Sequence, residues 1–218
     1  NPFLKEALQK ANDIDKIDFD NFDLVAVIHP GLGQDFKLPF LDPTPEDIPS
    51  TYIDSQMISK YLKEPIEIGN SIIDKGLILP ESQNHPLMDS LIYSTLVDPC
   101  DIQYSITGTW ALMIGFAVGL PPLWNIETGE SGVGIFGLMD QGSNNGRGMI
   151  PSIPNPWSRI YAGWEIPQTI FIPQKVTLHS NKKNSIIKIN ISDFEYFLIE
   201  NRNNWYRKGV DIDSARLS

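Results

Sequence analysis

The longest apolar stretch of the sequence, Trp110 to Leu123, constrains the fold most strongly. It has 14 residues, two of them prolines. A membrane-spanning helix needs roughly 18 or more apolar residues, so this stretch predicts a helix buried in a protein core instead. We expect the helix to run over residues 107–118, with Thr107 as its N-cap and Gly119 in the left-handed conformation after its end. Because its residues are apolar on every side, protein should enclose it.

The composition is that of an acidic globular protein. Of the 218 residues, 41% are hydrophobic and 20% are charged, which fits an ordinary folded core. The formal net charge of −10 argues against nonspecific nucleic-acid binding, since that activity needs clustered Lys and Arg. The single cysteine, Cys100, excludes an intrachain disulfide, and nothing near it marks it as a nucleophile. No signal peptide and no membrane-spanning segment is visible in the sequence.

The first half of the chain predicts helices and strands around a long loop. Residues 3–11 place leucines and alanines on one helical face. The run Leu24–His29 is continuously apolar and rich in β-branched residues, which is typical of a central strand buried on both faces. The prolines of residues 31–53 exclude regular structure over about 15 residues, and a loop of that length is usually functional. Residues 76–80 predict a short edge strand, and residues 86–97 predict a helix.

The character of the sequence changes near residue 165. Beyond it, four stretches alternate or run as short strands: Gln168–Ile172, Lys175–His179, Ser185–Ile191 and Glu195–Glu200. We therefore expect a first domain of residues 1–165 and a strand-rich module of residues 166–218 that is incomplete in this chain, because so thin a sheet is marginal alone. Helices, a buried strand of the parallel type and late antiparallel strands together predict the α+β class.

Two groups of acidic residues are candidate sites. The segment DIDKIDFDNFD, residues 13–23, has the carboxylates of a calcium loop but lacks the spacing and the glycine turn of an EF-hand, so a solvated lead-in to a strand is favoured. Glu127, Glu130 and Asp140 lie in a glycine-rich stretch. They offer a carboxylate pair for acid–base chemistry, but a solvated loop is the favoured interpretation. The glycosylation sequon at Asn190 carries little weight.

The helix of residues 107–118 matches the pattern of a zinc-protease helix without its chemistry. Such a helix carries two histidines at i and i+4, a glutamate beside the first, a glycine at the exit and a third ligand beyond it. Aligning Gly119 with that glycine assigns the three ligand positions and the base position to residues of this sequence. We call these four positions, together with the methionine of GLMD, the zinc frame. These positions are Leu112 (first ligand), Met113 (base), Phe116 (second ligand), Pro122 (third ligand) and Met139 (a Met turn). No ligand or base position of the frame has a metal-binding side chain.

Four longer stretches, in order, resemble the M6 family of secreted metallopeptidases, the immune-inhibitor-A-like group. They are FDLVAVIHPGLGQDF, GFAVGLPPLWNIETGESGVGIFGLMDQGSNNG, NPWSRIYAGWEIP and DFEYFLIENRN. The resemblance covers roughly residues 17–204. It implies a zincin- or metzincin-like domain whose former active-site helix is buried, followed by the start of a β-sandwich, and an extracellular or cell-surface location. In the family's pattern the two His, the Glu and the Asp ligand correspond to Leu112, Phe116, Met113 and Pro122, so every functional position departs from the family.

The sequence therefore favours a pseudopeptidase with no catalytic residue, no zinc and a structural, assembly or peptide- or protein-binding role. Its partner would be another protein or the remainder of a larger polypeptide or assembly, and hydrophobic strands such as Tyr196–Ile199 need such a partner. The alternative is an active secreted metallopeptidase with a relocated metal site. It has less support, because His29, His85 and His179 have no second ligand at zinc-motif spacing on a helix.

Overall fold

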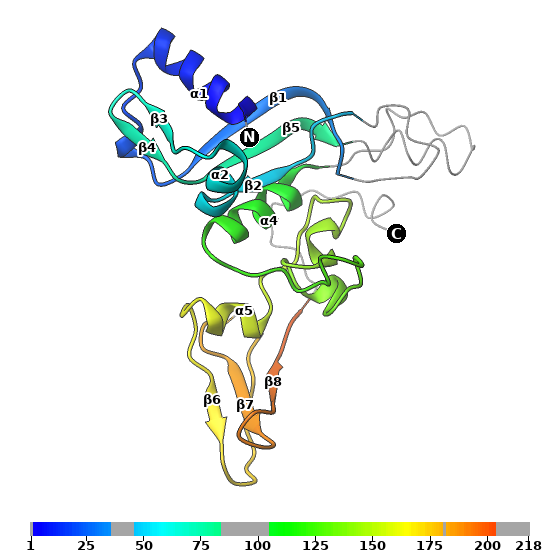
Figure 1. Ribbon diagram of the computed structural model, residues 1–218. Coiled ribbons are helices and arrows are strands. Elements are labelled where there is room, and N and C mark those ends of the chain that lie inside the picture. Colours follow the sequence, from blue (N-terminus) through cyan, green and yellow to red (C-terminus); the bar gives the residue numbers. More distant parts are fainter. Residues whose placement is uncertain (1, 36–45, 84–104, 181, 204–218) are drawn as a thin grey trace, which may run out of the picture. The chain divides into compact units, whose positions relative to one another are not determined.

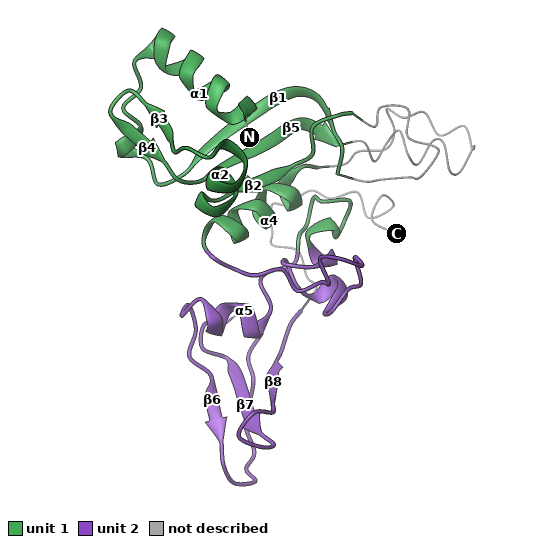
Figure 2. Ribbon diagram, in the orientation of Figure 1, with its two compact units in different colours: residues 1–118, 143–151 green, residues 119–142, 152–218 purple. Residues whose placement is uncertain are grey.

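The computed structural model describes residues 2–35, 46–83, 105–180 and 182–203 (Figure 1). By its internal contacts the chain divides into two units, coloured separately in Figure 2. Unit 1 comprises Asn1–Val118 and Ser143–Pro151, and unit 2 comprises Gly119–Gly142 and Ser152–Ser218. Both units contain helices and strands, so the α+β class is confirmed. The predicted boundary near residue 165 rests on the change in sequence character there, and it stays a prediction.

Unit 1 is built on a three-stranded sheet with the order β1-β5-β2. Strand β1 (Val25–Gly33) runs parallel to β5 (Gly76–Gln83), and β2 (Thr51–Ile53) runs antiparallel to it. A hairpin of β3 (Ile66–Ile68) and β4 (Ser71–Ile73) forms a separate small sheet.

The sheet corrects two sequence predictions. Residues 76–80, expected at an edge, belong to the central strand β5, whose Leu77, Ile78 and Leu79 are completely buried. Most of the run Leu24–His29, expected in the centre, lies in β1, which is an outer strand among the described ones and in which Ile28 is 59% exposed. Both runs are apolar, so the sequence alone does not show which of them has a strand on each side. In the structure β2 pairs with β5 and not with β1, and this places β5 in the centre.

Two helices cover the core of unit 1. Helix α1 (Pro2–Asp15) extends the predicted helix and buries Leu4 and Leu8, which are one turn apart. Helix α2 (Ser55–Leu62) begins after Asp54, whose side chain accepts a hydrogen bond from the N–H of Met57 at 2.8 Å. These helices and the short 3₁₀ helix η1 (Phe19–Asn21) contribute to one apolar cluster: Leu4, Leu8, Phe19, Ile53, Ile58, Ile66, Ile68, Ile73 and Ile78.

Helix α4 (Thr107–Ala117) is the predicted apolar helix, but protein does not enclose it on all sides. Only Gly108, Thr109 and Gly115 of its residues are buried, and Ile114 is 43% exposed. Thr107 is the first residue of the helix and not its N-cap. Its own N–H donates a hydrogen bond to the Oγ of Ser105 at 3.1 Å. Gly119 has a φ of 88°, so its predicted left-handed conformation is confirmed. No helix of the described part of the chain is long and apolar enough to cross a membrane.

Unit 2 holds a second three-stranded sheet, in the order β6-β7-β8, together with helix α5 (Pro156–Tyr161) and the 3₁₀ helix η3 (Gly134–Phe136). A further 3₁₀ helix, η4 (Gln141–Asn144), lies where the two units join in sequence. Strands β7 (Ile186–Asn190) and β8 (Tyr196–Glu200) form an antiparallel hairpin.

Strand β6 (Gln168–Ile170) is parallel to β7, so the late strands, which we expected to be antiparallel, are antiparallel only at β7 and β8. Residues 175–179, predicted as a strand, are not in one. The helix predicted over residues 86–97 and Cys100 lie outside the described residues.

A close approach at the start of α4 gives a first testable prediction. A β-carbon added at Gly108 would lie 1.7 Å from the backbone carbonyl oxygen of Ser143. In an unconstrained helix, Gly108→Ala would stabilise by about 1 kcal/mol through helix propensity. Here we expect it to destabilise unit 1 by about 1–3 kcal/mol, because backbone must move to make room. Urea unfolding measures the free energy of unfolding of Gly108→Ala and shows whether it rises or falls. The control is Ala111→Gly, which measures the effect of helix propensity alone in the same helix. An unchanged or higher stability for Gly108→Ala would contradict the contact.

Candidate functional site

Three positions of the zinc frame lie on α4 in unit 1. Leu112, Met113 and Phe116 are all half-buried. The ring of Phe116 stacks on Tyr52 of β2, with ring centroids 6.4 Å apart and an interplanar angle of 16°. Burial raises the pKa of the Tyr52 phenol, and the carboxylates of Asp54 and Asp74 raise it further. An aromatic pair therefore occupies the position that the frame assigns to the second metal ligand.

The other two positions of the zinc frame lie in unit 2. Met139 is completely buried, and Pro122 is half-buried. The N–H of Leu123 donates to the carbonyl oxygen of Met139 at 2.8 Å, so the segment after Gly119 pairs with the Met-turn-like segment. The five frame positions are thus divided three and two between the units, and all are apolar.

A partly buried polar network lies at the end of β5 and the start of α4, with Gln83 and Thr109 buried and Asp35 and Ser50 half-buried. The carboxylate of Asp35 accepts hydrogen bonds from the backbone N–H and the hydroxyl of Ser50, at 2.7 and 2.8 Å, and from the side-chain amide of Gln83 at 3.3 Å. The same amide of Gln83 contacts the hydroxyl of Thr109 on α4. Both Asp35 oxygens accept hydrogen bonds, so the network ties residues 35 and 50 to β5. Sequence reasoning missed it, because its four members are far apart along the chain.

The Asp140 carboxylate is enclosed by backbone N–H groups rather than by solvent. Asp140 is only 4% exposed, so its expected place in a solvated loop is wrong. Its Oδ2 accepts four hydrogen bonds, from the Ser131 hydroxyl and from the N–H groups of Gly132, Val133 and Gly134, at 2.7–3.0 Å. Its Oδ1 accepts the N–H of Gln141 at 2.8 Å. Consecutive N–H groups that converge on one anion form a nest.

This nest makes Asp140 a structural anion. Burial alone would raise the pKa of Asp140, but the hydrogen bonds from the 131–134 loop and from Gln141 outweigh it and hold that pKa below its ordinary value. A carboxylate with a lowered pKa is a weak base, and its two oxygens are already engaged. Glu127 and Glu130 are exposed. The sequence signal for the nest is the SGVG stretch a few residues before the aspartate.

Two of the three histidines lie in the described structure, His29 in unit 1 and His179 in unit 2. His29 is 8% exposed in β1, with Nδ1 3.0 Å from the carbonyl oxygen of Pro30 and its ring edge-on to Phe3. His179 is exposed, and His85 lies outside the described residues. Among the residues that the structure describes, no three His, Cys, Asp or Glu side chains are grouped to hold a metal ion, calcium included. The expected absence of zinc stays a prediction, because this search covers only part of the chain.

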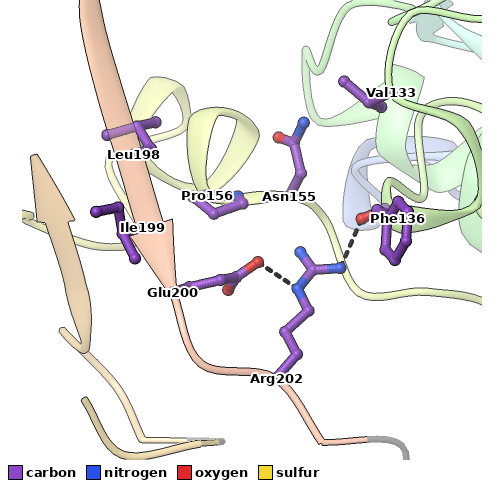
Figure 3. Close-up of a pocket in the computed structure, with 8 residues that line it drawn as sticks. All are labelled: Val133, Phe136, Asn155, Pro156, Leu198, Ile199, Glu200 and Arg202. Atoms are coloured by element: carbon purple, nitrogen blue, oxygen red, sulfur yellow. Dashed lines mark hydrogen bonds and ion pairs between the residues drawn. The ribbon is translucent and has the colours of Figure 1, made fainter.

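A hollow of about 470 Å³ lies in unit 2 beside β8, and no motif in the sequence predicted it (Figure 3). We call it the β8 hollow; its lining residues are Val133, Phe136, Asn155, Pro156, Leu198, Ile199, Glu200 and Arg202. Its walls are mainly apolar.

The charges around the β8 hollow are matched. Glu200 pairs with Arg202 and, at 2.7 Å, with Arg159, which in turn lies 3.3 Å from Glu165. The guanidinium of Arg202 also donates to the carbonyl oxygen of Phe136. Two arginines and two glutamates thus fasten the walls together and leave no net charge.

Comparison with family models, with curated proteins and with solved structures found no match to this chain. The resemblance to the M6 family therefore rests on the sequence motifs, and the zinc frame remains a hypothesis about Leu112, Met113, Phe116, Pro122 and Met139.

The Asp140 nest gives a second prediction. Asp140→Asn replaces one accepting oxygen with an NH₂ group that faces N–H donors, so we expect a loss of about 2–4 kcal/mol of stability at pH 7. The folded pKa of Asp140 is lowered, so its contribution is complete above the ordinary Asp pKa of about 3.9 and is lost as pH falls through the lower folded pKa. The wild-type protein should therefore lose more stability than Asp140→Asn between pH 7 and pH 3.

Denaturant melts at several pH values measure both effects. Glu127→Gln is the matched control, since this exposed carboxylate lies in the same glycine-rich region. Equal stability of Asp140→Asn and the control would show that the nest contributes nothing.

Proposed function

We propose that this chain is a catalytically inactive domain of the M6-peptidase type, with a structural, assembly or peptide- or protein-binding role in an extracellular or cell-surface protein. The observation that carries the proposal is the stack of Phe116 on Tyr52. In an active enzyme of this pattern the Phe116 position would hold an imidazole directed at a metal. Here an aromatic ring lies there, packed on the neighbouring strand.

The arrangement of unit 1 supports this proposal. Strand β2 is antiparallel to β5 and forms one edge of the sheet, and Tyr52 of β2 contacts α4 through Phe116. An edge strand beside a helix can hold an extended peptide by main-chain hydrogen bonds, which require no catalytic group. A non-catalytic binding role is therefore compatible with the loss of every ligand.

The energetics of the substitutions also favour a site turned into packing. A single histidine left in an empty metal site would bury an unpaired polar group at a cost of about 1–3 kcal/mol. Full burial of Leu, Met or Phe contributes roughly 1.5–3 kcal/mol each, and Leu112, Met113 and Phe116 gain part of this because they are half-buried.

Metal content is the direct test of this proposal and the third prediction. After incubation with excess zinc and desalting, we expect the purified chain to retain less than about a tenth of an equivalent by plasma mass spectrometry. Its melting temperature should not change with zinc, since a ligand that binds only the folded state would raise it. One tightly held equivalent with a melting shift of several degrees would reject the proposal and favour an active peptidase with a relocated metal site.

Restoration of the ligands tests whether the zinc frame is aligned correctly, and it is the fourth prediction. The variant Leu112→His, Met113→Glu, Phe116→His, Pro122→Asp should bind about one equivalent of zinc, because histidines at i and i+4 share a face of α4. The control is Met113→His with Ala117→His, an i, i+4 pair shifted by one residue and without a third ligand. Isothermal titration should show at least tenfold tighter zinc binding for the restored frame. Equal affinities would show that the frame is misaligned.

A further inference from the structure

The free edge of β8 lies next to the β8 hollow. Strand β8 pairs with β7 alone among the described strands. In the hairpin, Ile191 donates to its opposite residue Glu195 at 2.8 Å, so these two form a hydrogen-bonded pair. Hydrogen-bonded and non-hydrogen-bonded pairs alternate along an antiparallel ladder. Phe197 and Ile199 therefore direct their N–H and C=O groups at β7, and Leu198 and Glu200 direct theirs at the free edge.

The two residues that carry these outward groups line the β8 hollow. Figure 3 shows Leu198, Ile199 and Glu200 on one side and Val133 and Phe136 across from them. None of the described backbone groups bonds the N–H or C=O of Leu198 or Glu200 from this side. Unpaired main-chain donors and acceptors at a sheet edge are a template for an added strand. A volume of about 470 Å³ lies in the range of pockets that enclose a ligand, and it suits a few residues of extended chain.

The chemistry of the walls selects an uncharged occupant. The two charged residues that line the hollow, Glu200 and Arg202, already pair with each other, and Arg159 also binds Glu200. Because these charges are already paired, a charged ligand side chain would gain little from them beyond one nitrogen of Arg202, Nη2, which has no hydrogen-bond partner among the described residues. The remaining walls are largely apolar, from Val133, Phe136, Pro156, Leu198 and Ile199.

The sheet beyond β8 favours the same occupant. The strand registers place Ile170, Ile187, Ile189, Phe197 and Ile199 on one face together with Gln168, so this face has no charged residue. Phe197 is 61% exposed and Ile199 is 43% exposed. A strand added at β8 would place every second side chain in line with this face, where apolar and β-branched side chains pack against their cross-strand neighbours.

We propose that the β8 hollow binds an extended peptide segment of a partner protein, which adds to the edge of β8 and carries uncharged, apolar residues at alternate positions. The walls are fixed before binding, because Arg202 joins Glu200 of β8 to the carbonyl oxygen of Phe136. Preformed walls lower the entropy lost on binding. The proposal is independent of the zinc frame, since every lining residue lies in unit 2 and no frame residue takes part.

The fifth prediction uses blocked heptapeptides in which threonine alternates with valine, leucine, isoleucine or phenylalanine. Nuclear magnetic resonance titration of the full chain should shift the amides of Leu198 and Glu200 and give a Kd below about 1 mM for at least one peptide, equivalent to −4.1 kcal/mol. The same peptides with glutamate at the alternating positions should bind at least tenfold more weakly. Slower deuterium exchange at Leu198 and Glu200 with bound peptide would confirm main-chain pairing.

A pair of variants in η3 separates binding in the hollow from binding elsewhere. Phe136 lines the hollow and is 67% exposed, so Phe136→Glu replaces an apolar wall with a carboxylate without disturbing a core, and it should weaken binding of an apolar peptide at least tenfold. Its neighbour Ile135 is 53% exposed and does not line the hollow, so Ile135→Glu should bind like the wild type. Absence of binding by every apolar peptide, equal affinity of the two variants, or shifts confined to other amides would each overturn the proposal. The metal-content result bears on none of these outcomes.

Discussion

Unit 1 depends on the backbone pairing of β5, because both other strands of its main sheet bond to it. The parallel ladder with β1 and the antiparallel ladder with β2 leave Leu77, Ile78 and Leu79 without solvent contact. Three fully buried aliphatic side chains contribute several kcal/mol of hydrophobic stabilisation. The same pairing holds β2 at the edge, where Tyr52 meets Phe116. The candidate site on α4 is therefore positioned by a strand that carries none of its residues.

Three described carboxylates that are buried or half-buried bind the protein's own groups. Asp140 gathers the N–H groups of a glycine-rich loop, and Asp35 joins Ser50 to Gln83 at the end of β5. Glu200 joins Arg159 to Arg202 and so connects α5 to the chain after β8. A buried charge is tolerated only where hydrogen bonds or an opposite charge compensate for its lost water. Each of these anions is compensated from within its own unit, which makes it a fixed part of the fold.

The sequence predicted the positions of the helices and strands better than it predicted which strands pair. The helical periodicity of residues 3–11 and the apolar run at residues 107–118 located α1 and α4, and Gly119 marked the end of α4 correctly. The predicted order of the strands was wrong. The apolar runs of β1 and β5 have similar composition, and composition does not show which of them pairs with β2.

The candidate sites were harder to predict than the elements. The zinc frame could be aligned from spacing on one helix, since i and i+4 positions share a face. The β8 hollow and the Asp140 nest join residues that are distant in sequence, or depend on the direction of N–H groups in a glycine-rich loop. Neither long-range contact nor the direction of an N–H group can be read from one sequence without an alignment.

On the proposed interpretation, the complete loss of the zinc ligands has a physical reason. A metal site without its metal leaves imidazoles and carboxylates that lack both water and a partner, and each such group destabilises the fold. Once one ligand is lost, affinity for zinc falls and the remaining ligands become a cost, so their replacement by apolar side chains stabilises the domain. The positions Leu112, Met113, Phe116 and Pro122 have the composition that such a process would leave, with no polar residue among them. The carboxylate of Asp140 would escape the same pressure, because its partners are backbone N–H groups that are present whether or not a metal is bound.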